Sequence, residues 1–361
     1  MQEYIIIGGG VIGTFIAHEL SQTTSSITLI EKEEDLALVQ TKNNSALIHS
    51  PVMVPPHKGE LKAKLALEGN QIYQSLVDEF KVPHLKNGAY VLALNEEEMR
   101  DVKALYEDAK ARNLDASIVS VNTLRRNEKN VSKKVVGGLE LKDAMTADTF
   151  ALCQILEKSA KSTGVRFEKS TTVTDITVLD DGFLVTTNHN KSYKTKHVIN
   201  AAGVKAEHIA KMVEAQPPYK MMPHRGEYMV LPSTYRNFVN HTFFPVPKKD
   251  TKGILAIPQP NGTIRLGPTS TFQEALDEAK VTQEGLTAIK TTMNQLLNYV
   301  PYSQVEKTYA GIRSTINQDD FYIKRSFEHP NFIHVAGIDS PGVTAAPAIA
   351  KYLKKEILNL K

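Results

Sequence analysis

The chain has 361 residues and a formal net charge of +3, with 41% hydrophobic and 23% charged residues. This length and composition predict a globular protein of about two domains, and the small net charge argues against a nucleic-acid surface, which concentrates Lys and Arg. The single cysteine, Cys153, excludes an internal disulfide, a cysteine-based zinc site and a cysteine-ligated iron–sulfur cluster. We find no convincing pattern of metal ligands.

Two features predict where the protein works. No apolar run approaches the ~18 residues that a membrane-spanning helix needs. The first expected strand begins within four residues of Met1, so we expect no signal peptide before it. We therefore expect a cytoplasmic protein, and peripheral contact with the inner face of the membrane stays open.

The first thirty or so residues carry a dinucleotide-binding pattern. An apolar strand leads into Gly8, and Gly10 and Gly13 complete a G-x-G-x-x-G spacing at the start of a helix. The first glycine permits a tight turn, the second lets a pyrophosphate approach the backbone, and the third lets the helix lie close to the strand. A second strand delivers Glu31, whose carboxylate suits an adenosine ribose. The pattern predicts bound FAD or NAD(P).

The next part of the chain begins with a polar linker. The proline-rich stretch 51–56 is expected to be an extended turn, because proline disfavours helix before and within it. A strand and a charged helix further along break the rhythm of the nucleotide-binding fold, which we interpret as the start of a second domain. The expected elements are a helix over 58–81, a strand over 88–94, a helix over 96–112 and a strand over 117–121.

The middle of the chain predicts one helix followed by successive strands. Asp148 is expected to cap a helix over 149–163. The sequence Asp180-Asp-Gly182 is a hairpin signal. The last strand ends in a second junction between a strand and a glycine, at Gly203. The expected strands are 165–167, 173–178, 183–187 and 192–200.

The last part of the chain begins at Pro217 and Pro218, which mark a second boundary. Ser340 is expected to cap the final helix, with Pro341 at the first helical position. Pro347, inside that helix, indicates either a bend that frees a backbone group or a tolerated early proline. The other expected elements are strands over 224–231, 253–258, 263–267, 321–325 and 333–337 and a helix over 282–297.

The order of these motifs resembles the FAD-dependent oxidoreductases of the D-amino-acid-oxidase superfamily. Within it, the chain resembles the glycerol-3-phosphate dehydrogenase/oxidase and L-2-hydroxyglutarate oxidase branch, in particular the short bacterial glycerol-3-phosphate form, over essentially its whole length. The chain departs from the branch just after His49, where Ser50-Pro51 stands in place of a small residue and glycine. The stretches that carry the resemblance are 44–49, 59–64, 225–228, 266–269, 309–313 and 339–347.

The resemblance implies an α/β fold with two domains. One is a Rossmann-like FAD-binding domain with a β-meander, and the other is a smaller α+β substrate domain with a mixed or antiparallel sheet. The final helix is expected to point its N-terminus at the flavin ring. The expected FAD-binding domain comprises 1–82, 146–215 and 308–361, and the substrate domain comprises 83–145 and 216–307.

The resemblance also implies which residues contact FAD. Glu31 is expected at the adenosine ribose, and Ser340 with the first amides of the final helix would stabilise negative charge at the flavin edge. The full expected set is Gly8, Gly10, Val11, Ile12, Gly13, Glu31, Lys32, Asn44, Ser45, Val173, Ala202, Gly203, Gly311, Gly337, Ser340, Gly342, Val343 and Thr344.

Oxidising a secondary alcohol needs an acceptor for the hydroxyl proton, and histidine suits this role because its pKa lies near working pH. His49 follows the 44–45 loop and is the expected base or hydrogen-bonding partner. An anionic substrate end needs fixed positive charge, for which Arg313 is the first choice and Lys252 the second. Arg225 could reach the same site or form a structural ion pair with Glu227.

The leading interpretation is FAD-dependent oxidation of glycerol 3-phosphate to dihydroxyacetone phosphate, with reoxidation by O2 or a membrane quinone. A second interpretation is an anionic 2-hydroxy acid substrate such as L-2-hydroxyglutarate, and a third is an amine or amino-acid oxidase. A fourth is an FAD-binding partner subunit without turnover, which the Pro51 departure favours and the presence of His49 and Arg313 opposes.

Overall fold

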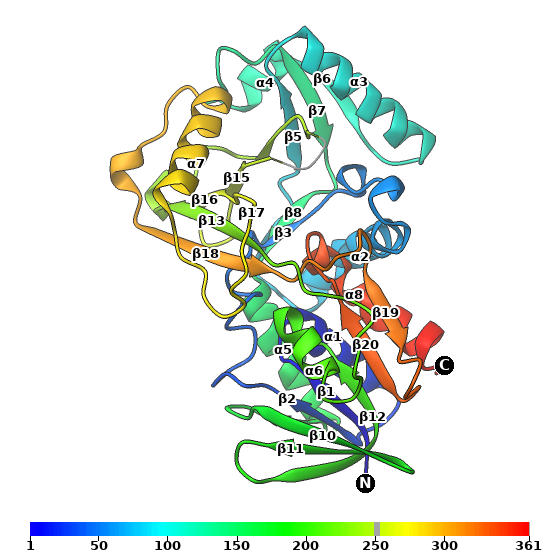
Figure 1. Ribbon diagram of the computed structural model, residues 1–361. Helices are drawn as coiled ribbons and strands as arrows, with labels where there is room; N and C mark the ends of the chain where they lie inside the picture. The colour runs from blue at the N-terminus through cyan, green and yellow to red at the C-terminus, as the bar shows by residue number, and fades with distance from the viewer. Residues whose placement is uncertain (249–252, 361) are drawn as a thin grey trace.

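The computed structural model describes residues 1–248 and 253–360. Figure 1 shows two bodies, one above the other, each built around a large β-sheet. The two ends of the chain lie in the lower body, and between them the chain enters the upper body twice, first with β5 to β7 and again with β13 to β18.

The lower body contains an eight-stranded sheet with the order β10-β11-β12-β1-β2-β9, in which β20 pairs with β12 and β19 pairs with β20. Strands β9, β2, β1, β12 and β20 run parallel, whereas β10, β11 and β12 form the predicted antiparallel meander. The strands are β1 (Gln2–Ile7), β2 (Ile27–Ile30), β9 (Arg166–Glu168), β10 (Val173–Leu179), β11 (Gly182–Thr187), β12 (Ser192–Asn200), β19 (Tyr322–Arg325) and β20 (Phe332–Ala336).

Both faces of this sheet are covered, and β1 shows why. Alternate side chains of a strand point to opposite faces. Tyr4 and Ile6 belong to the hydrophobic cluster shared with the helices, whereas Ile5 and Ile7 belong to the cluster shared with the meander. An unbroken apolar strand therefore predicts a central position. The helices of this body are α1 (Val11–Leu20), α2 (Glu60–Glu79), α5 (Thr149–Ser162), α6 (Ala206–Ala210) and α8 (Gly342–Tyr352).

The upper body contains a nine-stranded sheet with the order β17-β13-β16-β15-β14-β5-β7-β6, in which β18 also pairs with β13. Among the strand pairs of residues 1–248 and 253–360, only β14 and β5 in this sheet are parallel, so the sheet is mixed, as predicted. The strands are β5 (Ala89–Ala93), β6 (Ser117–Ser120), β7 (Gly137–Leu141), β13 (His224–Leu231), β14 (Thr242–Pro245), β15 (Leu255–Pro258), β16 (Ile264–Gly267), β17 (Thr271–Phe272) and β18 (Lys307–Arg313), and the helices are α3 (Glu96–Ala111), α4 (Val121–Asn127) and α7 (Gln283–Leu296).

A small antiparallel sheet comprises β3 (Leu47–Ile48), β8 (Met145–Ala147) and β4 (His84–Leu85). Figure 1 labels β3 and β8 between the upper and the lower body. Strand β18 belongs to the upper sheet, although the expected boundary before residue 308 would give it to the FAD-binding domain. The rest of the two-domain division stays a prediction.

The prediction of an extended turn over 51–56 is wrong. Residues Pro51–Met53 and Pro56–Lys58 each form a turn of 3-10 helix. Ser50 precedes the first turn, and its hydroxyl accepts a hydrogen bond from the Val52 amide at 3.3 Å. Proline is tolerated at the first position of a helical turn because its missing N–H would have no helical partner there.

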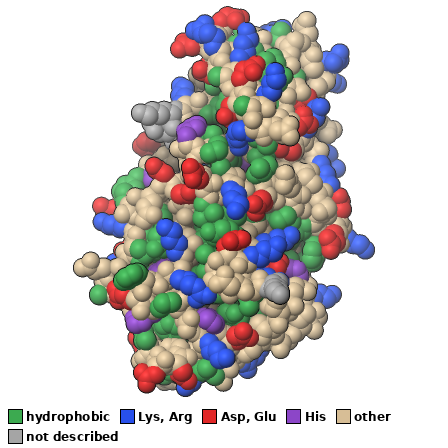
Figure 2. Space-filling model, turned by 90° about the vertical axis from the view of Figure 1, so that its right-hand side faces the viewer, with side chains coloured by type: hydrophobic (Ala, Val, Ile, Leu, Met, Phe, Trp, Pro, Cys, Tyr) green, Lys and Arg blue, Asp and Glu red, His purple; other side chains and the backbone are tan. Residues whose placement is uncertain are grey.

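The surface and the helices bear on the class of partner. The face drawn in Figure 2 carries Lys and Arg interspersed with Asp and Glu, without one continuous basic region. Over residues 1–248 and 253–360, no helix combines the length and apolar composition needed to cross a bilayer.

Candidate active site

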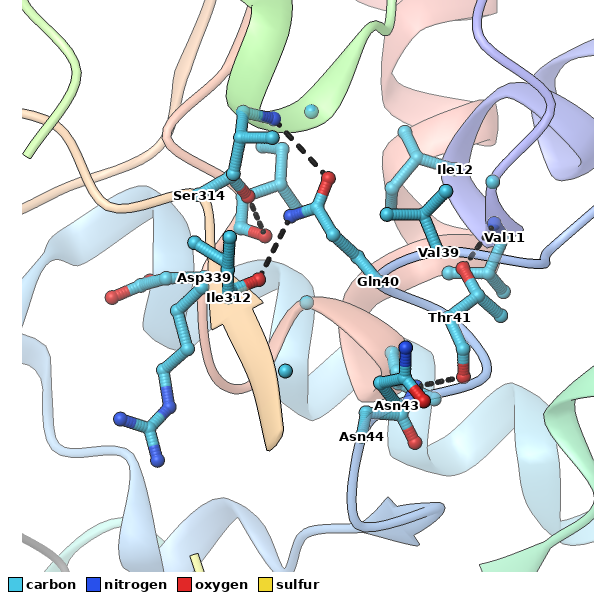
Figure 3. A pocket seen from close by; sticks show the side chains of 18 of the residues that line it. Val11, Ile12, Val39, Gln40, Thr41, Asn43, Asn44, Ile312, Ser314 and Asp339 are labelled. Carbon is cyan, nitrogen blue, oxygen red and sulfur yellow. Dashed lines mark hydrogen bonds between the residues drawn. The ribbon is translucent and has the colours of Figure 1, made fainter. Parts of the chain in front are cut away.

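A cavity of about 500 Å³ is lined by residues from both bodies. Its size is in the range of small-molecule and cofactor sites. The turn from β1 into α1, the linker over 37–45 and the start of α8 contribute from the lower body, and β13 and β18 contribute from the upper body. Figure 3 shows part of this lining, with Val11 and Thr41 on one side and Ile312 and Asp339 on the other.

The glycine motif forms the part of the cavity where β1 meets α1. Gly8 has a φ of +109°, and a Cβ there would lie 2.4 Å from the Ala201 carbonyl oxygen. A Cβ on Gly13 would lie 1.9 Å from the Gly8 carbonyl oxygen, so only glycine permits this close packing. Gly10 and Val11 line the cavity, and the N-terminus of α1 therefore offers an anion-binding position.

Glu31 directly follows β2 and also lines the cavity. Its carboxylate accepts hydrogen bonds from the Gly9 amide at 2.6 Å and the Glu33 amide at 2.9 Å. Burial raises the pKa of Glu31, and these two amides and neighbouring Lys32 oppose the shift. The carboxylate is therefore held in place at the cavity wall by backbone amides of the chain itself.

Two residues of the polar linker, Gln40 and Thr41, have structural roles that the sequence does not reveal. The Thr41 hydroxyl accepts a hydrogen bond from the Val11 amide at 3.0 Å. The Gln40 side chain accepts one from the Val204 amide at 3.1 Å and donates one to the Ile312 carbonyl at 3.2 Å (Figure 3). Gln40 thus links the lower body to β18, and no local pattern marks such long-range contacts.

The loop that carries Asn44 is fixed on both sides. The Asn44 amide group donates to the Thr41 carbonyl at 2.6 Å, and its oxygen accepts from the Ala46 amide at 2.6 Å. Arg265 and Tyr309 of the upper sheet donate to the Asn44 carbonyl, at 2.6 and 3.1 Å. These contacts place the residues before His49 against the cavity.

His49 is buried and held by its backbone as well as by its ring. Its amide donates to the Thr344 hydroxyl at 2.9 Å, and its carbonyl accepts from the Asn70 side chain at 3.0 Å. Its Nε2 lies 3.3 Å from the Ser340 hydroxyl oxygen. Helices α2 and α8 therefore fix the imidazole at the cavity wall, and the structure brings His49 and Ser340 together.

The predicted capping role of Ser340 is wrong. Helix α8 begins at Gly342, Pro341 occupies the cap position, and no side chain caps the helix. The Ser340 hydroxyl faces His49 instead of the helix amides. Gly342 still lines the cavity, so the N-terminus of α8 opens onto it, and its orientation toward the flavin ring stays a prediction.

Arg313 ends β18 and lines the cavity. Its Nη1 donates to the Ser270 hydroxyl and its Nη2 donates to the Thr269 carbonyl, both at 2.9 Å. Arg225 instead pairs with the fully buried Glu227 at 2.9 Å, which is the structural alternative that the sequence left open. The guanidinium at the cavity is therefore that of Arg313.

Tyr228 of β13 lines the cavity and was not predicted there, although it ends the stretch 225–228 that carries the resemblance. Burial raises the pKa of Tyr228, and Arg313, Arg265 and a hydrogen bond with Ser45 oppose the shift. The neutral phenol thus belongs to the wall contributed by the upper body.

Three expected site residues do not line the cavity, and a fourth, Lys252, lies outside the described residues. Val173 is buried in the cluster beneath the meander, Gly13 packs against Gly8, and Thr344 holds His49. The expected residues that do line it are Gly8, Gly10, Val11, Ile12, Glu31, Lys32, Asn44, Ser45, His49, Ala202, Gly203, Gly311, Arg313, Gly337, Ser340, Gly342 and Val343. In the described part of the chain, no group of His, Cys, Asp and Glu side chains could hold a metal ion.

The residues present fit a dinucleotide. The cavity combines two helix N-termini, a fixed carboxylate and glycines whose Cβ atoms would collide with neighbouring groups. A Cβ on Gly311 would lie 2.2 Å from the Asn43 carbonyl oxygen, so the wall at β18 also requires glycine.

Comparisons with known proteins agree with this fit. The sequence pattern of the FAD-dependent oxidoreductases matches residues 3–355. A glycerol 3-phosphate dehydrogenase from Caloramator mitchellensis is 34% identical, with 100% of this chain and 74% of that protein covered. A glycerol 3-phosphate oxidase from Mycoplasma genitalium is 30% identical, with 99% and 95% covered.

A solved structure leads to the same family. L-α-glycerophosphate oxidase from Mycoplasma pneumoniae with FAD bound has a TM-score of 0.91 and 28% identity, covering 100% of this chain and 95% of that chain. Its fold is that of the two bodies described above. The chain therefore belongs to the family of FAD-dependent oxidoreductases, and FAD is its cofactor.

Proposed function

We propose that this protein oxidises sn-glycerol 3-phosphate to dihydroxyacetone phosphate with FAD. The observation that carries the proposal is that the His49–Ser340 pair and the Arg313 guanidinium line the same cavity as the dinucleotide-binding turn. In this proposal the His49–Ser340 pair accepts a proton and Arg313 binds an anion. Oxidation of this substrate needs both a proton acceptor and a group that binds its phosphate. The names of the relatives support the choice of substrate.

FAD, when bound, accepts the hydride that leaves the carbinol carbon. In our proposal, the hydroxyl proton reaches His49 Nε2 through Ser340, whose hydroxyl gives its own proton to the imidazole as it takes the proton of the substrate. The backbone contacts to Asn70 and Thr344 hold this imidazole, so little reorganisation accompanies the proton transfer.

Arg313 binds the phosphate in this proposal. A guanidinium has five N–H donors in a planar fork, so the bonds to Thr269 and Ser270 fix its orientation while other donors remain for phosphate oxygens. Lys252 stays a proposed second cation, since it lies outside the described residues. The wall at Tyr228 would exclude water from the substrate.

The remaining proposed roles concern the cofactor and the acceptor. Gly8, Gly10 and the N-terminus of α1 would hold the pyrophosphate, and Glu31 would accept hydrogen bonds from the adenosine ribose. The N-terminus of α8 would stabilise negative charge at the flavin. We propose O2 or a quinone as the final electron acceptor.

Anaerobic bleaching of the flavin absorbance tests the substrate. Glycerol 3-phosphate should bleach the bound FAD, whereas L-2-hydroxyglutarate and amino acids should not. L-2-hydroxyglutarate is the main rival, because L-2-hydroxyglutarate dehydrogenase of Escherichia coli is 27% identical over 75% of this chain and Arg313 suits a carboxylate equally well. Bleaching by the rival alone would refute our choice.

Two variants test the proposed roles. His49→Asn should slow bleaching about 100-fold or more with little change in substrate affinity, because a general base typically contributes 10²–10⁴. Arg313→Met should mainly weaken binding of the anion, while Arg100→Met on the exposed side of α3 serves as a matched control. The opposite pattern, with slow chemistry in Arg313→Met and weak binding in His49→Asn, would refute both assignments.

A further inference from the structure

The segment Gly59–Lys64 is the one stretch of the family resemblance that has no place in the mechanism above. It forms the start of α2, where the Leu61 and Lys62 amides donate to the Asp320 carboxylate at 2.8 and 2.7 Å. Gly59 has a φ of +127°, and a Cβ there would meet Asp320 at 2.9 Å. The first turn of α2 is therefore fixed against the loop before β19.

This turn aims Lys62 at the cavity wall. Its ammonium lies 2.8 Å from Asp339 Oδ1 and 5.2 Å from the centre of the Phe321 ring. The two side chains of the ion pair are only 12% and 18% exposed. The pair is thus largely shielded from solvent. Two charges interact more strongly in such a shielded place than at the surface.

Asp339 is the partner that touches the site. It lines the cavity and appears at its wall beside Ile312 in Figure 3. The next residue is Ser340, whose hydroxyl lies 3.3 Å from His49 Nε2. A carboxylate at this place would repel an anionic substrate and oppose the uptake of electrons by the cofactor unless a cation neutralises it.

We propose that Lys62 is a positioning residue that neutralises Asp339 and holds the turn before Ser340. The wall of the site then stays electrically neutral toward an anionic substrate and toward FAD as it gains electrons. The part that concerns the substrate rests on the proposed function, whereas the part that concerns FAD does not.

The test compares Lys62→Met, Lys62→Arg, Asp339→Asn and the double variant Lys62→Met/Asp339→Asn, with Lys64→Met as the matched control. Lys64 is exposed on the same helix, with its ammonium 5.8 Å from the Tyr352 ring centre. The first readout is the two-electron reduction potential of bound FAD, and the second is the dissociation constant of inorganic phosphate followed by the flavin spectrum.

Lys62→Met should lower the equilibrium constant for FAD reduction about tenfold, which is about 30 mV for a two-electron couple. It should weaken phosphate binding about tenfold as well. Lys62→Arg and the double variant should restore both values, because each keeps the pair neutral, and Lys64→Met should match the wild type. Asp339→Asn alone should raise the potential, since it leaves a positive charge.

An unchanged potential in both single variants would overturn the proposal, as would a double variant no better than Lys62→Met. The opposite sign expected for Asp339→Asn keeps the test valid if Lys62→Met fails to fold. The potential needs no substrate, so its shift is judged separately from bleaching by glycerol 3-phosphate. If glycerol 3-phosphate fails to bleach the wild type while the reduction potentials of the variants shift as expected, only the proposed function is refuted.

Discussion

The crossing of α2 and α8 depends on one glycine, and this gives a sharp prediction. A Cβ on Gly69 would lie 2.0 Å from the Thr344 carbonyl oxygen and 3.0 Å from the Ala345 Cα. Ordinary contacts of a Cβ begin near 3.4 Å. Gly69→Ala must therefore push the two helices apart by more than an ångström at their point of closest contact.

The expected cost follows from two opposing effects. Overpacking a tight contact costs about 1–3 kcal/mol, and a collision between two backbones belongs at the upper end. Replacing glycine by alanine inside a helix stabilises it by about 1 kcal/mol. The net loss should be about 2 kcal/mol, roughly a 30-fold change in the folding equilibrium.

The same displacement should reach the active site. Thr344 accepts the hydrogen bond from the His49 amide at 2.9 Å, so a shift of α8 moves the anchor of the imidazole. A misplacement of 1 Å can cost about 10²-fold in rate, and the anaerobic bleaching rate should fall by a comparable factor. FAD binding, which we propose to involve Gly8 and Glu31, should change much less.

The assay is urea unfolding followed by far-ultraviolet circular dichroism, since the chain contains no tryptophan. Gln71→Ala, on an exposed position of the same helix, is the matched control and should stay within about 0.5 kcal/mol of the wild type. If Gly69→Ala proves more stable than the wild type, the gain from helix propensity exceeds the cost of overpacking, and the inferred collision does not exist.

Three further predictions concern buried groups. Burial raises the pKa of Glu31, so in FAD-free protein its contribution to stability is complete at low pH and is lost as pH rises through its folded-state pKa. Thermal unfolding at a series of pH values should show that Glu31→Gln gains stability relative to the wild type as pH rises. A stability difference between the two proteins that does not change with pH would contradict the reasoning. Burial raises the pKa of the Cys153 thiol to about 12, so Ellman's reagent should react only after unfolding, and rapid reaction of the native protein would exclude this environment. Glu128 accepts hydrogen bonds from the Asn240 and His241 amides, and Glu128→Ala should lower the free energy of unfolding by about 3 kcal/mol in urea titrations, whereas the exposed Glu97→Ala should not.

The sequence predicts best where the physical cause is local. The glycine spacing at Gly8 requires a tight turn, and the carboxylate of Asp148 caps α5 by accepting hydrogen bonds from the Phe150 and Ala151 amides. The family resemblance places His49 and Arg313 at one cavity, since their positions in the chain match its motifs. The glycine turn and the Asp148 cap are recognisable because neighbours in the sequence determine them, whereas His49 and Arg313 are recognisable only through the resemblance.

The failures have physical reasons as well. Proline counts against a helix, yet Ser50 caps a 3-10 turn in which Pro51 takes the first position. Ser120 likewise caps α4, where the sequence suggested that the strand would continue through Val121. Ser340 resembles a cap in sequence, but its hydroxyl faces His49, a residue 291 positions away. The bonds of Gln40 to Val204 and Ile312 likewise form only after the chain has folded.

The position of β18 has a consequence for how specificity can change. Arg313 ends a strand that hydrogen-bonds along β13 in the upper sheet, whereas Gly8 and Glu31 directly follow β1 and β2 of the lower sheet. In the roles that we propose for these residues, holding the cofactor and choosing the substrate thus depend on two different sheets that share one cavity. Tyr228 and Arg313, which line the cavity from β13 and β18, are therefore the natural positions for redesigning substrate choice. Gly311 and the Arg265 and Tyr309 side chains that hold the Asn44 loop should be kept.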